Sequence, residues 1–396
     1  MWSPERCSTS GIAVLGEGPA REEVAQGFTF AGPSGRELEK ILARAGIARS
    51  EVAIENAFGC WKPDDAKPAD EVRAVEACRE RVWDFLDEVK PSGVLCLGGR
   101  AMRSVAPGFA ANALSDGLMR HRGSLWARRE IDSANSTHTV GSWGYRMGLL
   151  PESVTFVNFT IHPAAIIRRE RLERFPAMGY RGVPSLDLRR LSDACSVGRS
   201  QLPVRSTIGL PALTSLNDGF VFDLETTSDE SRRPELLGVQ LLSGGPVYQM
   251  HWEGARDWAE EAFRMRVVKA GHNIQGFDLH VLWGEGIRAV EPLFDTMAMG
   301  GMCEPDMARG LYYQQAYYLG HKRPFHKELV GADLRKKHEV RRQYALRRAW
   351  SQHPLAENVS LESEAEWMRF YNMLDVDNTR LVMIEQKKRS EMEGWL

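Results

Sequence analysis

Short apolar runs alternate with helical patterns along the first half of the chain, from residue 11 to 194. The runs IAVLG, VAIEN and GVLCLGG each have the length of a buried strand. Apolar residues recur with helical spacing over residues 36–45 and 69–89. Because strands that alternate with helices build parallel sheets, we predict an α/β domain here. The polar stretch 124–151 has no pattern and predicts a loop inserted into this domain.

The pattern starts again at Gly219 with three further runs, GFVFDLETT, LLGVQLLS and PVYQMHW, which indicate an antiparallel meander. Helical patterns fill most of the remaining sequence. Residues 195–217 mix Ser, Gly, Pro and Thr without periodicity, which is typical of a linker. We therefore predict a first domain over 1–194, a linker over 195–217 and a second domain over 218–396.

Length and composition agree with this division. The chain has 396 residues, and at about 150 residues per domain this predicts two or three domains. The 43% hydrophobic and 26% charged content is that of a globular protein and excludes disordered and collagen-like classes. No apolar run reaches the roughly 18 residues of a membrane span, and the N-terminus lacks a signal peptide, so we expect no membrane partner and a cytoplasmic location. Six scattered cysteines without a CxxC motif fit a reducing compartment.

Several polar residues of the first domain follow predicted strands. Glu17 comes after IAVLG, Asn56 ends VAIEN, and His162 follows VTFVNF. Glu23 and Phe30 lie between the first of these strands and the next helix. Because ligands bind beyond the carboxyl ends of parallel strands, we expect Glu17, Asn56 and His162 to converge.

These motifs, GEGPA, GFTFAGPSG, VAIEN and HPAAIIR, resemble in order and spacing the uracil-DNA glycosylase superfamily, in particular its iron–sulfur bacterial and archaeal branch. The resemblance runs from about Ile12 to Leu191 and implies a three-layer α/β/α domain that excises uracil from DNA. It also implies a role for five residues of the pocket. Phe30 would stack on flipped-out uracil, Asn56 would read its edge and His162 would steady the departing base, while Glu17 and Glu23 would shape the pocket and position the attacking water.

The chemistry of base excision needs the same groups. The glycosidic bond breaks through a sugar cation and a uracil anion, which a carboxylate and a hydrogen-bond donor stabilise. The segment from Ile166 to Arg168 could wedge into the gap left by the base and hold a phosphate. Ala20 stands where the family has glycine, and its methyl group could narrow the pocket.

The iron–sulfur branch carries four cysteines. Cys60 and Cys78 stand where two family ligands lie, but upstream only Cys7 is present, with Ser10 in the place of its CxxC partner. A [4Fe–4S] cluster takes four thiolates. Two interpretations stay open: an incomplete cluster site formed by Cys7, Cys60 and Cys78, or buried remnants of a lost one.

The second domain holds three acidic motifs. Asp223 and Glu225 alternate along a strand and therefore share one face. Asp278 follows an apolar strand, and Tyr371 and Asp375 lie one helical turn apart. Clustered carboxylates bind two Mg²⁺ or Mn²⁺ ions, which is the arrangement that phosphodiester hydrolysis uses.

FDLETT, GHNIQGFD, FDTM and YNMLDVDNT resemble, in order, the DEDD 3′–5′ exonucleases of the Tyr subtype and specifically the proofreading domain of the DNA polymerase I family. The resemblance covers residues 219–388 and implies an RNase H-like fold. By it, Tyr371 positions the nucleophile, and Asp295 and Asp377 cap helices or support the site. The metal ligands it implies are Asp223, Glu225, Asp278 and Asp375.

A basic stretch over 335–348, with seven Lys or Arg and one Glu, suits a phosphate backbone or is a solvated helix face. His321, Lys322, His326 and Lys327 lie in a polar loop that could touch the strand. We predict a bifunctional repair or replication-fidelity enzyme, with a fusion typical of a phage replication apparatus. Its partner is DNA with uracil or 3′ ends, single-stranded or frayed. Two alternatives stay open: a non-catalytic uracil- or single-strand-binding module that delivers DNA to the nuclease, and a proofreading subunit of a separate DNA polymerase.

Overall fold

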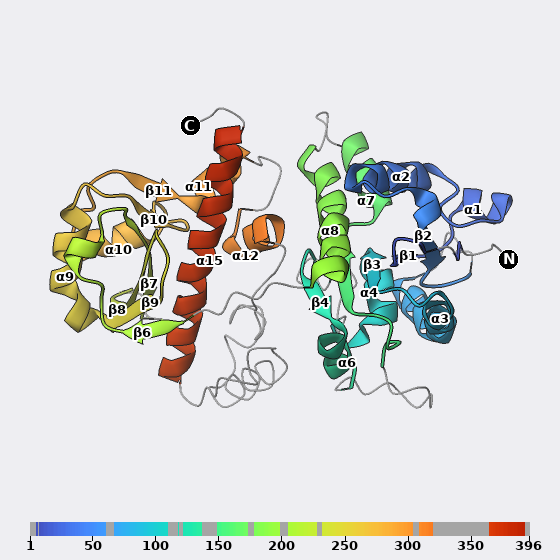
Figure 1. Ribbon diagram of the computed structural model, residues 1–396, viewed down its shortest axis with the longest axis horizontal. Helices are drawn as coiled ribbons and strands as arrows, with labels where there is room; N and C mark the ends of the chain where they lie inside the picture. Colours follow the sequence, from blue (N-terminus) through green and yellow to red (C-terminus); the bar gives the residue numbers. More distant parts are fainter. Residues whose placement is uncertain are drawn as a thin grey trace. The chain divides into compact units, whose positions relative to one another are not determined.

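The computed structural model describes residues 5–6, 8–60, 67–109, 118, 122–136, 149–172, 178–198, 205–227, 232–303, 309–319 and 364–392. The chain divides into two compact units (Figure 1). Described residues up to Gly198 belong to the first unit, and those from Arg205 onward belong to the second.

The first unit is a five-stranded sheet covered by helices on both faces, with strand order β2-β1-β3-β5-β4. The strands β2, β1, β3 and β5 run parallel, and the edge strand β4 is antiparallel to β5. Its strands are β1 (Ile12–Gly16), β2 (Val52–Asn56), β3 (Gly93–Leu97), β4 (Leu125–Ala127) and β5 (Phe156–Thr160). Its α-helices are α1 (Arg21–Gln26), α2 (Pro33–Ala45), α3 (Pro68–Val89), α4 (Gly99–Val105), α6 (Arg128–Ser136), α7 (Pro163–Leu172) and α8 (Met178–Val197).

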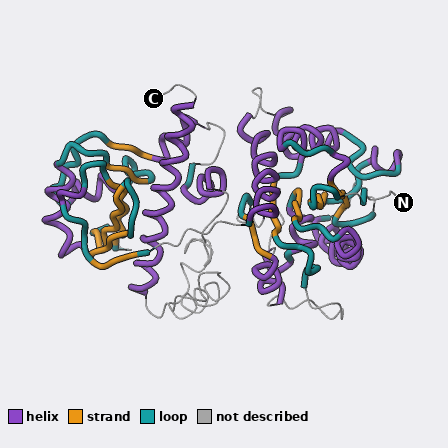
Figure 2. Tube along the Cα trace, in the orientation of Figure 1, coloured by secondary structure: helices purple, strands orange, loops and turns teal. Residues whose placement is uncertain are grey.

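Two helical layers bury the four parallel strands completely. Leu15, Cys96 and Phe159 face a core shared with α3 and α4. On the other face, α8 packs on β3 and β5 and beside α2. Every residue of β1, β2, β3 and β5 is buried, as expected for a parallel sheet covered on both sides. The three-layer α/β/α prediction is therefore confirmed (Figure 2).

A buried ion pair fixes the end of β5. Arg122 and Asp187 are each 1% exposed, with 3.5 Å between guanidinium nitrogen and carboxylate oxygen. The Thr160 hydroxyl, at the end of β5, donates to the same carboxylate at 2.6 Å. Removing one partner of such a pair typically costs about 3–5 kcal/mol, because the other charge stays buried. Through its bond to Thr160, Asp187 therefore ties α8 to the strand that leads into His162.

The second unit is built on a six-stranded sheet of order β11-β10-β7-β8-β9-β6. Its strands are β6 (Ser206–Ile208), β7 (Phe220–Thr226), β8 (Pro234–Leu241), β9 (Val247–His251), β10 (Lys269–Gly271) and β11 (Leu293–Asp295). Its α-helices are α9 (Trp252–Arg264), α10 (Asp278–Gly284), α11 (Thr296–Cys303), α12 (Leu311–Gln314) and α15 (Glu364–Met392). A five-residue π-helical turn, Gln315–Leu319, follows α12.

The order and direction of these strands define an RNase H-like fold. The strands β7, β8 and β9 form the predicted antiparallel meander, and β10 and β11 extend the sheet in parallel on the other side of β7. One face packs on α9 and α10, and α15 covers the other. The register pairs Ala270 of β10 with Val221 of β7, so the end of β10, which precedes Asp278, lies beside the first half of β7.

Two expectations about irregular segments need revision. The predicted loop over 124–151 is wrong in part, since it contains the edge strand β4 and the helix α6. A three-residue edge strand is too short to show a period in the sequence. Within 195–217, α8 continues to Val197, and β6 pairs in parallel with β9. Among the described helices, none is long and apolar enough to cross a membrane.

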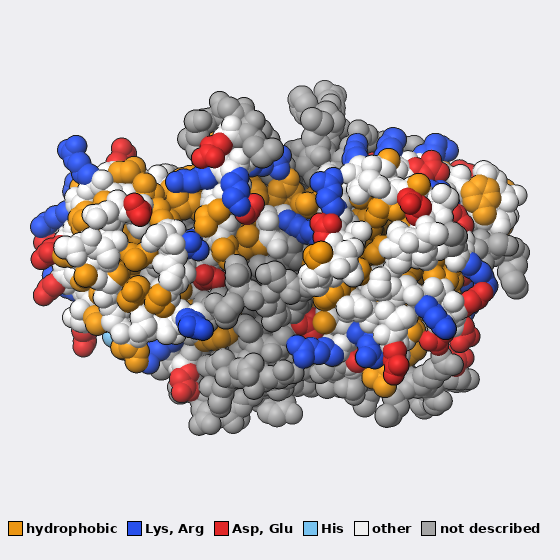
Figure 3. Space-filling view, viewed as in Figure 1, with side chains coloured by type: hydrophobic (Ala, Val, Ile, Leu, Met, Phe, Trp, Pro, Cys, Tyr) orange, Lys and Arg blue, Asp and Glu red, His pale blue; other side chains and the backbone are white. Residues whose placement is uncertain are grey.

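Acidic and basic side chains are interspersed with apolar ones over the visible face of each unit (Figure 3). The basic stretch 335–348 and the residues His321, Lys322, His326 and Lys327 lie outside the described residues.

Candidate functional site

The carboxyl ends of three parallel strands hold the predicted pocket residues of the first unit. Gly16 at the end of β1 is paired with Asn56 at the end of β2. Glu17 follows β1 directly, and His162 lies between β5 and α7. The structure therefore brings Glu17, Asn56 and His162 to one edge of the sheet, where we expected them.

Glu23 is a buried carboxylate that holds three segments together. It lies on α1 and is 6% exposed. Its Oε2 accepts a hydrogen bond from the Ala20 N–H at 2.5 Å, and its Oε1 accepts from the Phe30 N–H at 2.6 Å. Oε1 also accepts from Asn56 Nδ2 at 3.3 Å. These contacts fit a residue that positions the pocket better than one that binds the attacking water.

Phe30 has an unusual backbone conformation and a buried ring. Its φ is 52°, in the left-handed region, and its side chain is 4% exposed. The ring lies opposite His162, with centroids 5.9 Å apart and planes inclined by 26°. Gly16 and Gly35 permit this placement, since a Cβ at Gly16 would lie 2.6 Å from the ring and one at Gly35 only 1.6 Å from the Phe30 carbonyl oxygen.

One hydrogen bond fixes the tautomer of His162. The Ala164 N–H donates to Nδ1 at 3.1 Å, so Nδ1 is unprotonated and the neutral ring carries its proton on Nε2. Burial lowers the pKa of His162 below its ordinary value, while the charge of Glu17 raises it. The result is a neutral imidazole whose Nε2–H can donate to a ligand.

Asn56 is held from both sides. It is 1% exposed, its N–H donates to Glu55 Oε1 at 2.7 Å, and its carbonyl accepts from Arg81 at 2.6 Å. Glu55 and Arg81 are themselves an ion pair with an N···O distance of 2.6 Å. Since Glu23 accepts a hydrogen bond from Nδ2, the amide orientation is fixed. The second Nδ2 proton and Oδ1 stay available for a ligand.

Sequence reasoning missed Arg100, which holds the Glu17 carboxylate. The Arg100 side chain pairs with Glu17 at 2.5 Å and with Glu71 of α3, and its N–H donates to Glu17 at 3.3 Å. The only sequence signal was an arginine directly after the GG that ends the β3 run. Gly98 completes the arrangement, because a Cβ there would lie 2.4 Å from a Glu17 oxygen.

The predicted role of Ile166 as a wedge that enters the DNA is not supported. Ile166 is fully buried on α7, so its side chain cannot enter DNA. Arg168 is exposed, and its Nε donates to the Ala164 carbonyl at 3.3 Å. Ala20 is exposed and has an extended backbone at the start of α1.

The cysteine positions leave a cluster site incomplete in the described chain. Cys60 is exposed and Cys78 is partly buried, so the interpretation as a buried remnant does not hold for Cys60. Cys7 lies outside the described residues. The described chain supplies two of the family's thiolate positions, Cys60 and Cys78.

In the second unit, acidic residues gather around the end of β7. Asp223 and Glu225 lie on β7, and Asp278 begins α10. Asp278 is 2% exposed and accepts a hydrogen bond from the Leu224 N–H at 3.0 Å. Burial raises the pKa of Asp278 well above its ordinary value, and the neighbouring charges of Asp223 and Asp295 raise it further.

Tyr371 and Asp375 join this cluster from α15. Burial is the main reason that the pKa of Tyr371 lies well above its ordinary value. The charges of Asp375, Glu225 and Asp223 and a hydrogen bond to Asp375 raise this pKa further. All five predicted residues therefore belong to one electrostatic site.

The donor set fits hard divalent cations, since like charges packed this closely repel one another unless a cation neutralises them. Among the described residues, however, no group of three or more His, Cys, Asp and Glu side chains is already arranged to hold a metal ion.

Asn372, which the sequence analysis did not single out, orients Asp223. It is fully buried, and its Nδ2 donates to the Asp223 carboxylate at 2.9 Å. Gln249 of β9 donates to Asn372 Oδ1 at 2.9 Å, which fixes the amide orientation. A Cβ at Gly238 would lie 2.0 Å from the same oxygen, so glycine leaves room for it.

The two supporting acids each accept hydrogen bonds in the second unit. Asp295 accepts hydrogen bonds from the Met297 N–H at 2.9 Å, at the start of α11, and from the Asn273 N–H at 2.8 Å. Asp377 accepts from Gln240 at 3.1 Å.

Curated type-4 uracil-DNA glycosylases are similar to part of this chain. The type-4 uracil-DNA glycosylase of Pyrobaculum aerophilum is 33% identical over 162 residues, which are 41% of this chain and 70% of that protein. That of Archaeoglobus fulgidus is 27% identical over 161 residues, 41% of this chain and 69% of its own.

Among solved structures, Brucella melitensis NrnC with bound Mg²⁺ has 16% sequence identity and a TM-score of 0.34 and covers 49% of this chain and 85% of its own. The catalytic core of RRP6 from Trypanosoma brucei has 17% identity and a TM-score of 0.27, and covers 48% of this chain and 52% of its own.

A family model described as the uracil DNA glycosylase superfamily matches residues 4–178. This range contains Glu17, Glu23, Phe30, Asn56, Arg100 and His162. The chain belongs to the uracil-DNA glycosylase superfamily.

Proposed function

We propose that this protein is a bifunctional DNA-repair enzyme that removes uracil at the first site and 3′ nucleotides at the second. The observation that supports the first activity is that Phe30, Asn56 and His162 lie together at the carboxyl ends of the strands. The hydrogen bonds there fix one tautomer of His162 and one orientation of the Asn56 amide. Its substrates are uracil-containing DNA and single-stranded or frayed 3′ ends. Since these substrates are DNA, we place the protein in the cytoplasm of a bacterial or phage-infected cell.

Uracil excision breaks the bond between sugar C1′ and base N1. The base first leaves the helical stack, which costs a few kcal/mol, and stacking on Phe30 offsets this cost. Asn56 accepts from uracil N3–H and donates to O4, whereas cytosine presents an amino group and an unprotonated N3. This mismatch explains how the pocket would reject cytosine.

The departing base takes the bonding electron pair and becomes an anion. The Nε2–H of His162 donates to a uracil carbonyl oxygen, a bond that strengthens as the charge develops. Glu17 stabilises the sugar cation, and a water molecule then gives its hydroxide to C1′ and its proton to the base. Arg100 and Glu71 keep the Glu17 carboxylate in one orientation during these steps.

For the second site, the acidic cluster with Tyr371 supports 3′–5′ exonuclease activity. Asp223, Glu225, Asp278 and Asp375 would hold two Mg²⁺ or Mn²⁺ ions. Such ions activate water and stabilise the leaving oxygen of a phosphodiester. A tyrosine is protonated at neutral pH, and the raised pKa of Tyr371 keeps it so, which lets its hydroxyl donate a hydrogen bond and orient the attacking water.

Two other functions fit the same residues. The first unit would be a uracil- or single-strand-binding module without catalysis, or the chain would be the proofreading subunit of a separate, phage-type DNA polymerase. The intact set Glu17, Asn56 and His162 favours catalysis over binding alone. The measurements below separate these functions.

Loss of a carboxylate should abolish nuclease activity. Asp223→Ala or Asp375→Ala should stop the shortening of 5′-labelled DNA, because each removes a charge that holds the metal ions. EDTA should have the same effect on the unaltered protein. Uracil release should persist in both variants, and Asp218→Ala, which removes an exposed aspartate just before β7, should shorten DNA normally. Normal shortening by Asp223→Ala would exclude this assignment.

Loss of His162 should affect turnover more than binding. In single-turnover abasic-site formation, His162→Ala should be slower by roughly 10²–10³, as for loss of one oxyanion donor, with a smaller change in affinity. Asn56→Asp should weaken uracil recognition instead, because a carboxylate cannot donate to O4. Uracil-selective binding by unaltered protein that leaves no alkali-labile site would instead establish the non-catalytic module.

Removal of Glu17 should lower the pKa of His162 further. The negative charge of Glu17 raises this pKa, and the positive charge of Arg100 lowers it. Glu17→Gln removes the charge that raises the pKa and leaves Arg100, which lowers it, without this carboxylate partner. The imidazole should therefore stay neutral to a lower pH in the variant, as measured by NMR titration of the ring nitrogens. Glu22→Gln, which removes an exposed carboxylate of α1, is the control and should leave it unchanged. A raised or constant pKa in Glu17→Gln would contradict this pocket geometry.

A further inference from the structure

Phe30 needs support from its surroundings to keep its conformation. A non-glycine residue at a φ of 52° is in a sparsely populated region, which persists only where neighbouring groups enforce it. Glu23 enforces it on one side, through the hydrogen bond from the Phe30 N–H. The carbonyl side of the same residue requires a donor of its own.

Arg49 is that donor. It lies in the 3-10 turn Arg49–Glu51, directly before β2. One guanidinium nitrogen donates to the Thr29 carbonyl at 2.7 Å, and another donates to the Phe30 carbonyl at 3.3 Å. The planar guanidinium thus spans two consecutive carbonyls across 19 positions of sequence.

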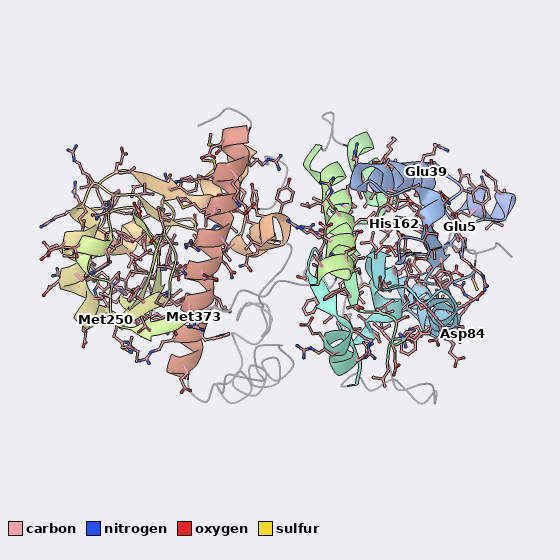
Figure 4. The ribbon with its side chains drawn as sticks, in the orientation of Figure 1. Glu5, Glu39, Asp84, His162, Met250 and Met373 are labelled. Carbon is pink, nitrogen blue, oxygen red and sulfur yellow. The ribbon has the colours of Figure 1, made fainter. Side chains whose placement is uncertain are left out.

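Two carboxylates fix Arg49 in turn. Glu5, which pairs with β2 through an isolated bridge to Ile54, approaches the guanidinium at 2.5 Å. Glu39 of α2 lies 3.4 Å away on the other side. The Arg49 side chain is 19% exposed, so water competes little for its donors. Glu5, Glu39 and His162 are labelled in Figure 4, in the same part of the first unit.

We propose that Arg49 is a positioning residue for uracil recognition, which acts by holding Phe30 in the left-handed conformation that sets its ring opposite His162. This inference rests on the proposed function, in which Phe30 stacks on the flipped base. Without Arg49, the Phe30 carbonyl loses its charged donor and the residue relaxes toward a common conformation. The ring then leaves its place, although no atom of Arg49 touches the base.

The test is a double-mutant cycle between Arg49→Met and Phe30→Leu. Affinity is measured by fluorescence anisotropy with DNA that carries 2′-fluorodeoxyuridine, a uracil nucleotide that resists cleavage, and with matched thymine DNA. Base stacking on an aromatic ring is worth about 5–100-fold in affinity. Each single variant should lose uracil selectivity within this range, and the double variant should lose less than twofold more than Phe30→Leu.

Two further variants separate positioning from general stability. Arg103→Met removes another poorly exposed guanidinium of this unit, 14% exposed and paired with Glu76 at 3.0 Å, and should keep selectivity within twofold. Arg49→Lys retains the charge, but a single ammonium cannot reproduce the planar bridge, so rescue should be partial. Arg49→Lys also serves if Arg49→Met does not fold.

Three results would overturn the inference: losses that multiply in the double variant, unchanged selectivity in Arg49→Met, or full rescue by lysine. Failure of the proposed function is a separate result, because unaltered protein would then show no preference for uracil DNA over thymine DNA.

Discussion

One buried carboxylate, that of Glu23, connects the parts of the first site. Burying an ionised carboxylate costs several kcal/mol unless hydrogen bonds replace its water. Three donors do so here, from Ala20, Phe30 and Asn56. Because they belong to the start of α1, the loop before α2 and the end of β2, the three segments can only be placed together. The position of the Phe30 ring and the orientation of the Asn56 amide are therefore two consequences of one desolvation requirement.

The second site follows the opposite design. Its carboxylates lie close enough that burial and mutual repulsion raise the pKa of Asp278 and of Tyr371. The scaffold opposes this repulsion with neutral donors, the Leu224 N–H to Asp278 and Asn372 Nδ2 to Asp223. Residual repulsion of this kind costs stability without a cation and favours cation binding, which is typical of functional sites that break local rules of folding. In the first site, hydrogen-bond donors of the protein compensate the buried carboxylate. In the second site, the repulsion between carboxylates favours the binding of a cation.

The sequence predicted the parts of both sites that depend on local pattern. The positions of Glu17, Asn56 and His162 after apolar strand runs correctly predicted that they lie close together. Alternation along β7 predicted that Asp223 and Glu225 share one face of the strand. Contacts between distant residues were not predictable, since Arg100 and Glu17 are 83 positions apart. The burial of Ile166 was missed because a strand-end motif does not show which face of α7 meets the core. The edge strand β4 was missed because three residues carry no period.

We propose that one chain carries a metal-independent excision site and a metal-dependent nuclease site. It is tested most directly with 5′-labelled DNA that contains one uracil, incubated with the protein with and without EDTA and then treated with alkali. We expect cleavage at the uracil position in both samples and progressive 3′ shortening only without EDTA, while thymine DNA is shortened but not cleaved internally. Absence of the alkali-labile site in both samples would contradict it.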